Sequence, residues 1–152
     1  MNAHAAGDLQ AIAAEWPAQG EAGGFWIAYH IGSEFYGETD ARFEDNGRYV
    51  LWSTVTQGRE RLEFSGRLDP DEVRGLVELV TRERLWTVRH VRPTQADDDA
   101  PAFLEAGDGV RRARVELWVS EAGSVPEFAR VQEAVLDLIR RVSDGAILEV
   151  GR

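Results

Sequence analysis

The chain has 152 residues, of which 43% are hydrophobic and 29% are charged. This length fits one domain with a single core, and the absence of cysteine excludes a disulfide framework, a zinc ribbon and a thiol nucleophile. All 17 basic residues are arginine and 27 residues are acidic, so the net charge is -10, which argues against nucleic acids and anionic membranes as partners. Residues 1–9 lack the basic start of a signal peptide and no apolar run approaches the ~20 residues of a membrane span, so we expect a cytoplasmic protein.

A short amphipathic helix is predicted for residues 7–16. Asp8 can cap its start, Pro17 ends it, and its apolar face consists of Leu9, Ile12, Ala13 and Trp16. The glycines within residues 19–24 indicate a flexible connector. We therefore expect residues 1–23 to form a short helix and a glycine-rich connector, with the helix docking loosely on the rest of the domain or serving a partner.

Between residues 24 and 68 the hydrophobic period changes to two, which is typical of strands. The predicted strands are residues 25–31, 39–44, 48–56 and 59–66. The second and third strands meet at Asp45-Asn46-Gly47, where Asn-Gly favours a type I′ turn with positive φ at both positions. Apolar and polar residues alternate along these strands, so we predict an antiparallel sheet with one covered face and one face in water.

The second helix has a clear predicted beginning. Asp69 is its expected N-cap, Pro70 occupies the first helical position, and Glu72 completes a capping box. Its apolar stripe consists of Val73, Leu76, Val77 and Val80. These positions predict a helix that buries one face against the sheet.

A second hairpin is predicted after this helix. Residues 86–91 are expected to form a short edge strand and residues 92–101 a loop. Residues 102–105 and 110–120 then form the hairpin, with alternate residues facing the core.

The last helix is predicted to begin after Ser124, with Glu127 as the capping-box partner, and to end at Gly145. The order α-ββββ-α-ββ-α indicates an α+β fold: an antiparallel sheet of about six strands with two main helices packed on one face and a short N-terminal helix. We expect a single domain over residues 1–152, with its core in residues 24–145.

Several catalytic chemistries lack their obligatory residues. The chain has no Gly-x-Ser-x-Gly motif, no phosphate-binding glycine loop and no lysine. No two of its three histidines stand four residues apart, as two ligands on one helix face do. The aspartates of residues 97–99, with Glu105 and Asp108 nearby, offer oxygen ligands but lack the spacing of a calcium loop. We predict no catalytic residue, no metal and no cofactor, with a carboxylate pair in a cleft left as an alternative.

The wet face of the predicted sheet is rich in tryptophan and arginine. The candidate partner-binding residues on it are Trp26, His30, Trp52, Trp118, Arg112 and Arg114. Tryptophan and arginine are enriched in binding hot spots, and an exposed apolar patch marks an interface. We expect the three tryptophans to lie close together with the arginines at the rim. In the alternatives, the N-terminal helix or the loop of residues 92–101 covers the tryptophans, or two copies pack these faces together as a homodimer.

Residues 68–79, which begin Leu-Asp-Pro-Asp-Glu-Val, and the aspartate-rich segment before Pro101 stand in a meander–helix–hairpin–helix order. In these features residues 25–142 resemble small bacterial domains of uncharacterised function, a resemblance that implies no catalytic residue. The order of elements is also similar to that of type III secretion chaperones, which are small, acidic and dimeric. Those chaperones have three strands where four are predicted here, and a likeness of architecture implies no function by itself.

Three functions from different classes follow from these features. The one we favour is a non-enzymatic protein-binding domain that acts through its aromatic and arginine-rich sheet face, on a protein partner or a second copy. The second is an acidic chaperone or immunity-type protein that masks a basic partner. The third is a small-ligand-binding protein or an enzyme with a pocket between sheet and helices.

Overall fold

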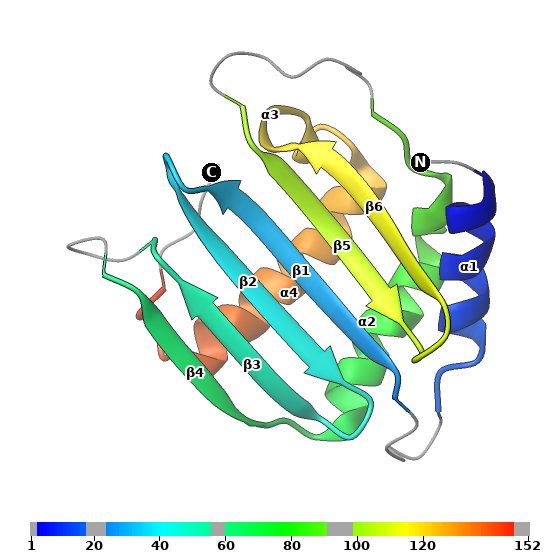
Figure 1. The fold of residues 1–152 in the computed structure, drawn as a ribbon, viewed down its shortest axis with the longest axis horizontal. Coiled ribbons are helices and arrows are strands. Elements are labelled where there is room, and N and C mark those ends of the chain that lie inside the picture. The colour runs from blue at the N-terminus through cyan, green and yellow to red at the C-terminus, as the bar shows by residue number, and fades with distance from the viewer. Residues whose placement is uncertain (1–2, 18–23, 56–59, 91–98, 148–152) are drawn as a thin grey trace.

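The computed structural model describes residues 3–17, 24–55, 60–90 and 99–147. Its strands are β1 (Trp26–Ser33), β2 (Gly37–Glu44), β3 (Arg48–Ser53), β4 (Leu62–Arg67), β5 (Pro101–Gly107) and β6 (Arg112–Trp118). Its helices are α1 (Ala3–Ala14), α2 (Pro70–Arg82), the 3-10 turn η2 (Leu85–Thr87), α3 (Val119–Ala122) and α4 (Pro126–Val142). The strands form one antiparallel sheet in the order β4-β3-β2-β1-β5-β6, with the helices behind it (Figure 1). The predicted α+β fold is confirmed.

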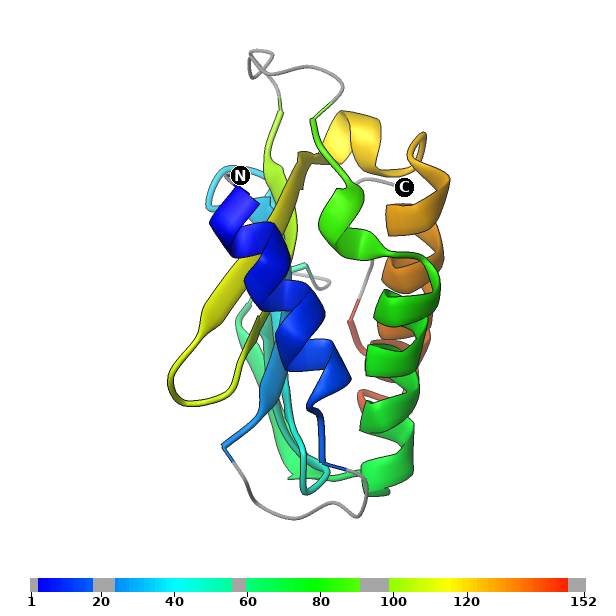
Figure 2. The same cartoon turned by 90° about the vertical axis from the view of Figure 1, so that its right-hand side faces the viewer.

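The sheet forms one layer and the helices form the other when the sheet is seen edge-on (Figure 2). The core lies between these two layers. The largest side chains that the sheet buries are Tyr29, Phe43, Leu51, Leu104 and Leu117. The side chains that α2 and α4 bury against them include Val73, Leu76, Val77, Val80, Phe128, Val131, Val135 and Ile139. The apolar spacing along the sequence therefore predicted the buried face of α2 correctly.

The first helix differs from its prediction in its bounds and in its packing. α1 spans Ala3–Ala14, so it begins four residues earlier than expected and ends before Trp16. Leu9 and Ile12 are fully buried, and the helix contacts β6, α2 and η2. Because α1 fills the space between α2 and the β6 side of the sheet, the expectation of loose docking was wrong.

The β2–β3 hairpin is confirmed, but its turn is not of type I′. Within the turn only Gly47 has a positive φ, of 93°, and its amide donates to the Glu44 carbonyl at 2.9 Å. This geometry is a type I turn followed by a left-handed glycine. Contacts outside the hairpin explain why residue 47 is a glycine. Its carbonyl accepts the Leu68 amide at 2.8 Å, and a Cβ at this position would lie 2.0 Å from the Leu68 oxygen.

The start of α2 agrees only partly with its prediction. Asp69 is the N-cap and accepts the Asp71 amide at 2.9 Å, and Pro70 begins the helix. The Glu72 carboxylate, however, pairs with Arg141 of α4. The Glu72 side chain, which was expected to complete a capping box at the start of α2, therefore forms an ion pair between α2 and α4 instead.

Two other predicted boundaries were wrong. α4 has Val125 as its N-cap, and the Ser124 amide donates to the Glu121 carbonyl in the turn that ends α3. The expected edge strand at residues 86–91 is the turn η2 instead, since Arg84, with a φ of 50°, redirects the chain directly after α2. Residue 91 lies outside the described residues.

Candidate functional site: the open face of the sheet

The face of the sheet that points away from the helices is the candidate site, and we call it the open face. Residues two apart on a strand share a face, and the pairing register aligns them into rows across the strands. The open face comprises Glu63, Ser65 and Arg67 of β4, Arg48, Val50 and Trp52 of β3, Glu38, Asp40, Arg42 and Glu44 of β2, Trp26, Ala28 and His30 of β1, Phe103 and Glu105 of β5, and Arg112, Arg114, Glu116 and Trp118 of β6.

The three predicted tryptophans all lie on the open face, but they do not form one cluster. Trp52 shares a row with His30, whereas Trp26 begins β1 two rows away and Trp118 ends the edge strand β6. The expected proximity was wrong because alternation assigns a residue to a face and only the register assigns it to a row. α1 does not cover these tryptophans, since it packs on the other side of the sheet. The loop proposed as a cover lies outside the described residues at 91–98.

Arg112 and Arg114 do not stand at the rim of an apolar patch, as the sequence suggested, because they hold Glu105 between them. Arg112 Nη2 is 2.7 Å from Glu105 Oε1, and Arg114 Nε is 2.9 Å from Glu105 Oε2. The Arg114 guanidinium also lies 3.8 Å from the ring centroid of Phe103. Glu105 is only 7% exposed, and a carboxylate removed from water needs such partners. The hydrogen bond from Arg112 and the negative charge of Glu105 in turn raise the pKa of Arg112.

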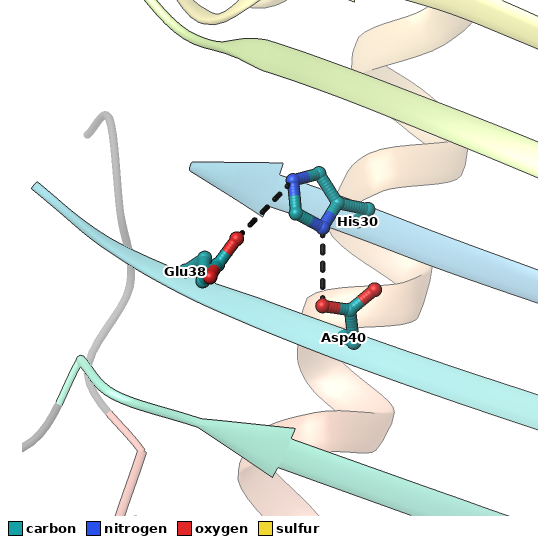
Figure 3. Close-up of side chains that lie close together, drawn as sticks. All are labelled: His30, Glu38 and Asp40. Atoms are coloured by element: carbon teal, nitrogen blue, oxygen red, sulfur yellow. Dashed lines mark hydrogen bonds and ion pairs between the residues drawn. The ribbon is translucent and has the colours of Figure 1, made fainter. Parts of the chain in front are cut away.

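His30 occupies the middle of the open face and contacts acceptors at both ring nitrogens (Figure 3). Its Nδ1 is 3.1 Å from Asp40 Oδ2, and its Nε2 is 3.1 Å from the Gly32 carbonyl and 3.9 Å from Glu38 Oε2. The ring stacks on Phe103 with centroids 4.8 Å apart. The sequence placed His30 on this face correctly, but these partners come from a register that it does not reveal.

These contacts change the proton affinity of His30. Burial of the ring acts to lower its pKa, but the hydrogen bond and charge of Asp40, the Gly32 carbonyl and the charge of Glu38 outweigh burial. The pKa of His30 is therefore raised above its ordinary value of 6.5. A protonated ring donates from both nitrogens, which suits an imidazolium between two carboxylates.

Among the described residues, His30, Glu38 and Asp40 are also the group whose potential ligand atoms lie within 4.8 Å of one another. A metal ion requires an unprotonated ring nitrogen with the carboxylates on the same side of it. Asp40 lies at Nδ1 and Glu38 at Nε2, at different edges of the ring (Figure 3). Each ring nitrogen thus has its own carboxylate neighbour, which is the arrangement that holds a protonated ring.

Three arginines line a hollow at another part of the open face, where β2, β3 and β4 run side by side. The hollow has a volume of about 650 Å³ and is lined by Arg42, Glu44, Arg48, Tyr49, Val50, Ser65, Gly66 and Arg67. Sequence reasoning missed Arg48 and Arg67. Arg48 stands two residues before Val50, which was a usable signal, whereas the position of Arg67 depends on the β3–β4 register.

A second polar group lies where β6 leads into α3. Glu121 Oε1 is 2.6 Å from His90 Nδ1 and accepts the Trp118 amide at 3.1 Å. Asp99 accepts the Ser120 amide at 3.1 Å and the Ser120 hydroxyl at 2.5 Å. Asp99 thus holds the start of a short helix, and the other two aspartates of its run lie outside the described residues.

One alternative from the sequence was a ligand pocket between the sheet and the helices. Leu9, Ile12, Ile27, Val77 and neighbouring side chains enclose a cavity of about 10 Å³ there. That volume is at most enough for one water molecule, and its lining is apolar.

No model of a known protein family matches this chain, and no curated protein was found to be similar to it in sequence. Along the described residues, no helix combines the length and apolar character needed to cross a bilayer. The function is therefore inferred from the geometry of the open face.

Proposed function

We propose that this protein is a non-enzymatic binding domain that holds another protein against the open face of its sheet. One observation carries the proposal: the helices cover one side of the sheet, and the other side presents aromatic rings with guanidinium groups over them. Arg42 lies 4.3 Å from the ring centroid of Trp26, and Arg61 lies 4.4 Å from that of Trp52. Aromatic and arginine side chains dominate the energetics of protein interfaces.

The dimensions of the open face suit a protein partner. Six strands at a spacing of about 4.8 Å span roughly 24 Å, and seven residues at about 3.4 Å give a similar length along the strands. A face of these dimensions covers about 580 Å², roughly three-quarters of the ~800 Å² that each partner contributes to a standard interface. Val50, which is 53% exposed, gives that face an apolar contact near its middle.

The two alternatives receive less support. A protein that masks a basic partner needs a surface of unpaired acids, but on the helices many acids pair with arginines, as Arg74 does with Asp71 and Arg130 with Glu83. A ligand-binding protein or enzyme needs a pocket between the layers, and the cavity that described residues such as Leu9 and Ile12 line there is too small for a ligand. The proposal includes no nucleic acid and no anionic membrane as partners, because the net charge of -10 disfavours both. It also places the protein in the cytoplasm, which suits a chain without cysteine.

The test is affinity capture from the cells that produce the protein, followed by binding measurements with the purified partner. We expect Trp52→Ala to weaken the complex by at least ~2 kcal/mol, because an aromatic anchor is lost from the face. The same change should also cost the free protein some stability, since Trp52 is only partly exposed and lies under Arg61, so the melting curve of the variant is measured alongside its affinity.

Arg82→Gln on α2 is the matched control, because Arg82 is exposed on the opposite side of the molecule. A partner bound equally well by wild type and by Trp52→Ala would contradict the proposal, and so would capture of no protein above background. A dimer of the chain that dissociates on Trp52→Ala would identify a second copy as the partner instead.

A further inference from the structure

Arg48 and Arg67 face each other directly across β3 and β4. Like charges at directly opposed positions destabilise a sheet. Within the described part of the chain, neither arginine forms an ion pair, although the protein has 27 acidic residues. Two opposed arginines without a carboxylate partner are expected at a binding site, because there the ligand supplies the negative charge.

Other arginines on or beside the open face do have carboxylate partners. Arg61 pairs with Glu63 at 2.9 Å, and Arg112 and Arg114 share Glu105. Among the described arginines of the open face, those without a carboxylate partner are Arg42, Arg48 and Arg67, and all three line the hollow. Three arginines and one glutamate line it, which leaves two positive charges in a protein whose net charge is -10.

The hollow continues toward β1. A second depression of about 300 Å³ shares Arg42, Glu44 and Arg48 with it and reaches Trp26. Together they cross from β4 to β1, three strand spacings or about 14 Å, which is the length of about four residues of extended chain. The depression is therefore long enough for a peptide segment.

We call the hollow and the depression together the groove, and two of its features suit the binding of carboxylates. Trp26 lies under the Arg42 guanidinium, and a guanidinium stacked on a ring keeps its N–H groups free to donate in its own plane. The exposed side chain of Val50 offers an apolar contact between the charges. Phosphate-rich nucleic acid fits less well, because its affinity depends on many cations and the rest of this protein repels it.

We propose that the groove of Arg42, Arg48 and Arg67 binds the carboxylates of an extended acidic segment of a partner protein. The inference rests on the proposed function and names the chemistry by which the open face recognises that partner. Each arginine is able to form a charge-assisted, bidentate hydrogen bond with a carboxylate of the segment.

The test uses a fluorescently labelled peptide of ten glutamates, with fluorescence anisotropy measured at low ionic strength. We expect the wild type to bind it and the double variant Arg48→Gln/Arg67→Gln to bind at least about tenfold more weakly, because two charge-assisted contacts are lost. Arg82→Gln should bind within about twofold of wild type, since Arg82 lies on α2 away from the groove. The melting temperature of the double variant should be unchanged or higher, because the like-charge pair is removed.

Several outcomes would overturn the inference: no binding of the glutamate peptide by the wild type, equal binding by the double variant, or a marked loss of thermal stability in that variant. Tighter binding of a ten-nucleotide single strand would identify a nucleic acid as the ligand instead, and tighter binding of a ten-lysine peptide would favour a basic partner. The capture experiment is separate, because loss of the partner on Trp52→Ala with no binding of the glutamate peptide would reject this inference and leave the proposed function standing.

Discussion

At the scale of single residues, the open face is organised by charges that meet across strands. His30 joins β1 to β2 through Asp40, and Arg112 and Arg114 join β6 to β5 through Glu105. Since the pKa of His30 is raised in the folded protein, its ionisation stabilises the fold fully below pH 6.5. This contribution is lost as the pH rises through the folded-state pKa.

Asp40→Asn should lower the pKa of His30, because the variant removes both the charge and the stronger hydrogen bond at Nδ1. An NMR titration of the His30 ring measures this pKa directly. The loss of unfolding free energy relative to wild type should be larger near pH 5.5 than near pH 9, where the ring is neutral in both proteins. Glu44→Gln is the control, as Glu44 lies on the same face in the row of Trp26. An unchanged His30 titration in Asp40→Asn would contradict this account.

At the scale of elements, local signals identified helices and strands better than they identified helix ends. Asp69 caps α2 because its side chain needs only the Asp71 amide two residues away. Ser124 was expected to cap α4 by the same rule, but its amide belongs to the turn that ends α3. The two helices differ in what comes before them: α3 leads directly into α4, and the turn that ends α3 includes Ser124, whereas a strand leads into α2.

Asp69→Ala should therefore lower the stability of the protein by about 0.5–2 kcal/mol without changing its fold. Ser124→Ala, the matched control, should have a much smaller effect because Ser124 is not an N-cap. Urea unfolding of both variants, followed by circular dichroism, measures the difference. Equal losses in the two variants would mean that α4 begins at Ser124 after all.

At the scale of the whole molecule, α1, α2 and α4 pack on one face of the sheet, and none of the described helices covers the other face. The position of α1 is decisive, because a helix folded over the tryptophans would have removed the proposed binding surface. α1 instead joins the core beside α2, with Ile12 at 0% exposure.

Ile12→Ala should destabilise the protein by about 2–5 kcal/mol, because it removes buried methyl groups and leaves a cavity. Gln10→Ala, an exposed change on the same helix, is the control and should be nearly neutral. Thermal and urea unfolding provide the comparison. A wild-type stability for Ile12→Ala would show that α1 docks loosely, as the sequence had suggested.

The amino-acid sequence by itself determined the main helices and the sheet strands of this protein, and the face on which the alternating strand residues lie. The alternation around Trp26, Trp52 and Trp118 placed all three on the open face, because a period of two is a local property of a strand. Only the tertiary structure decided their rows, the contact of His30 with Asp40 and the opposition of Arg48 and Arg67. Strand register and helix docking join residues far apart in the chain, and local periodicity contains no information about which distant residue becomes a neighbour.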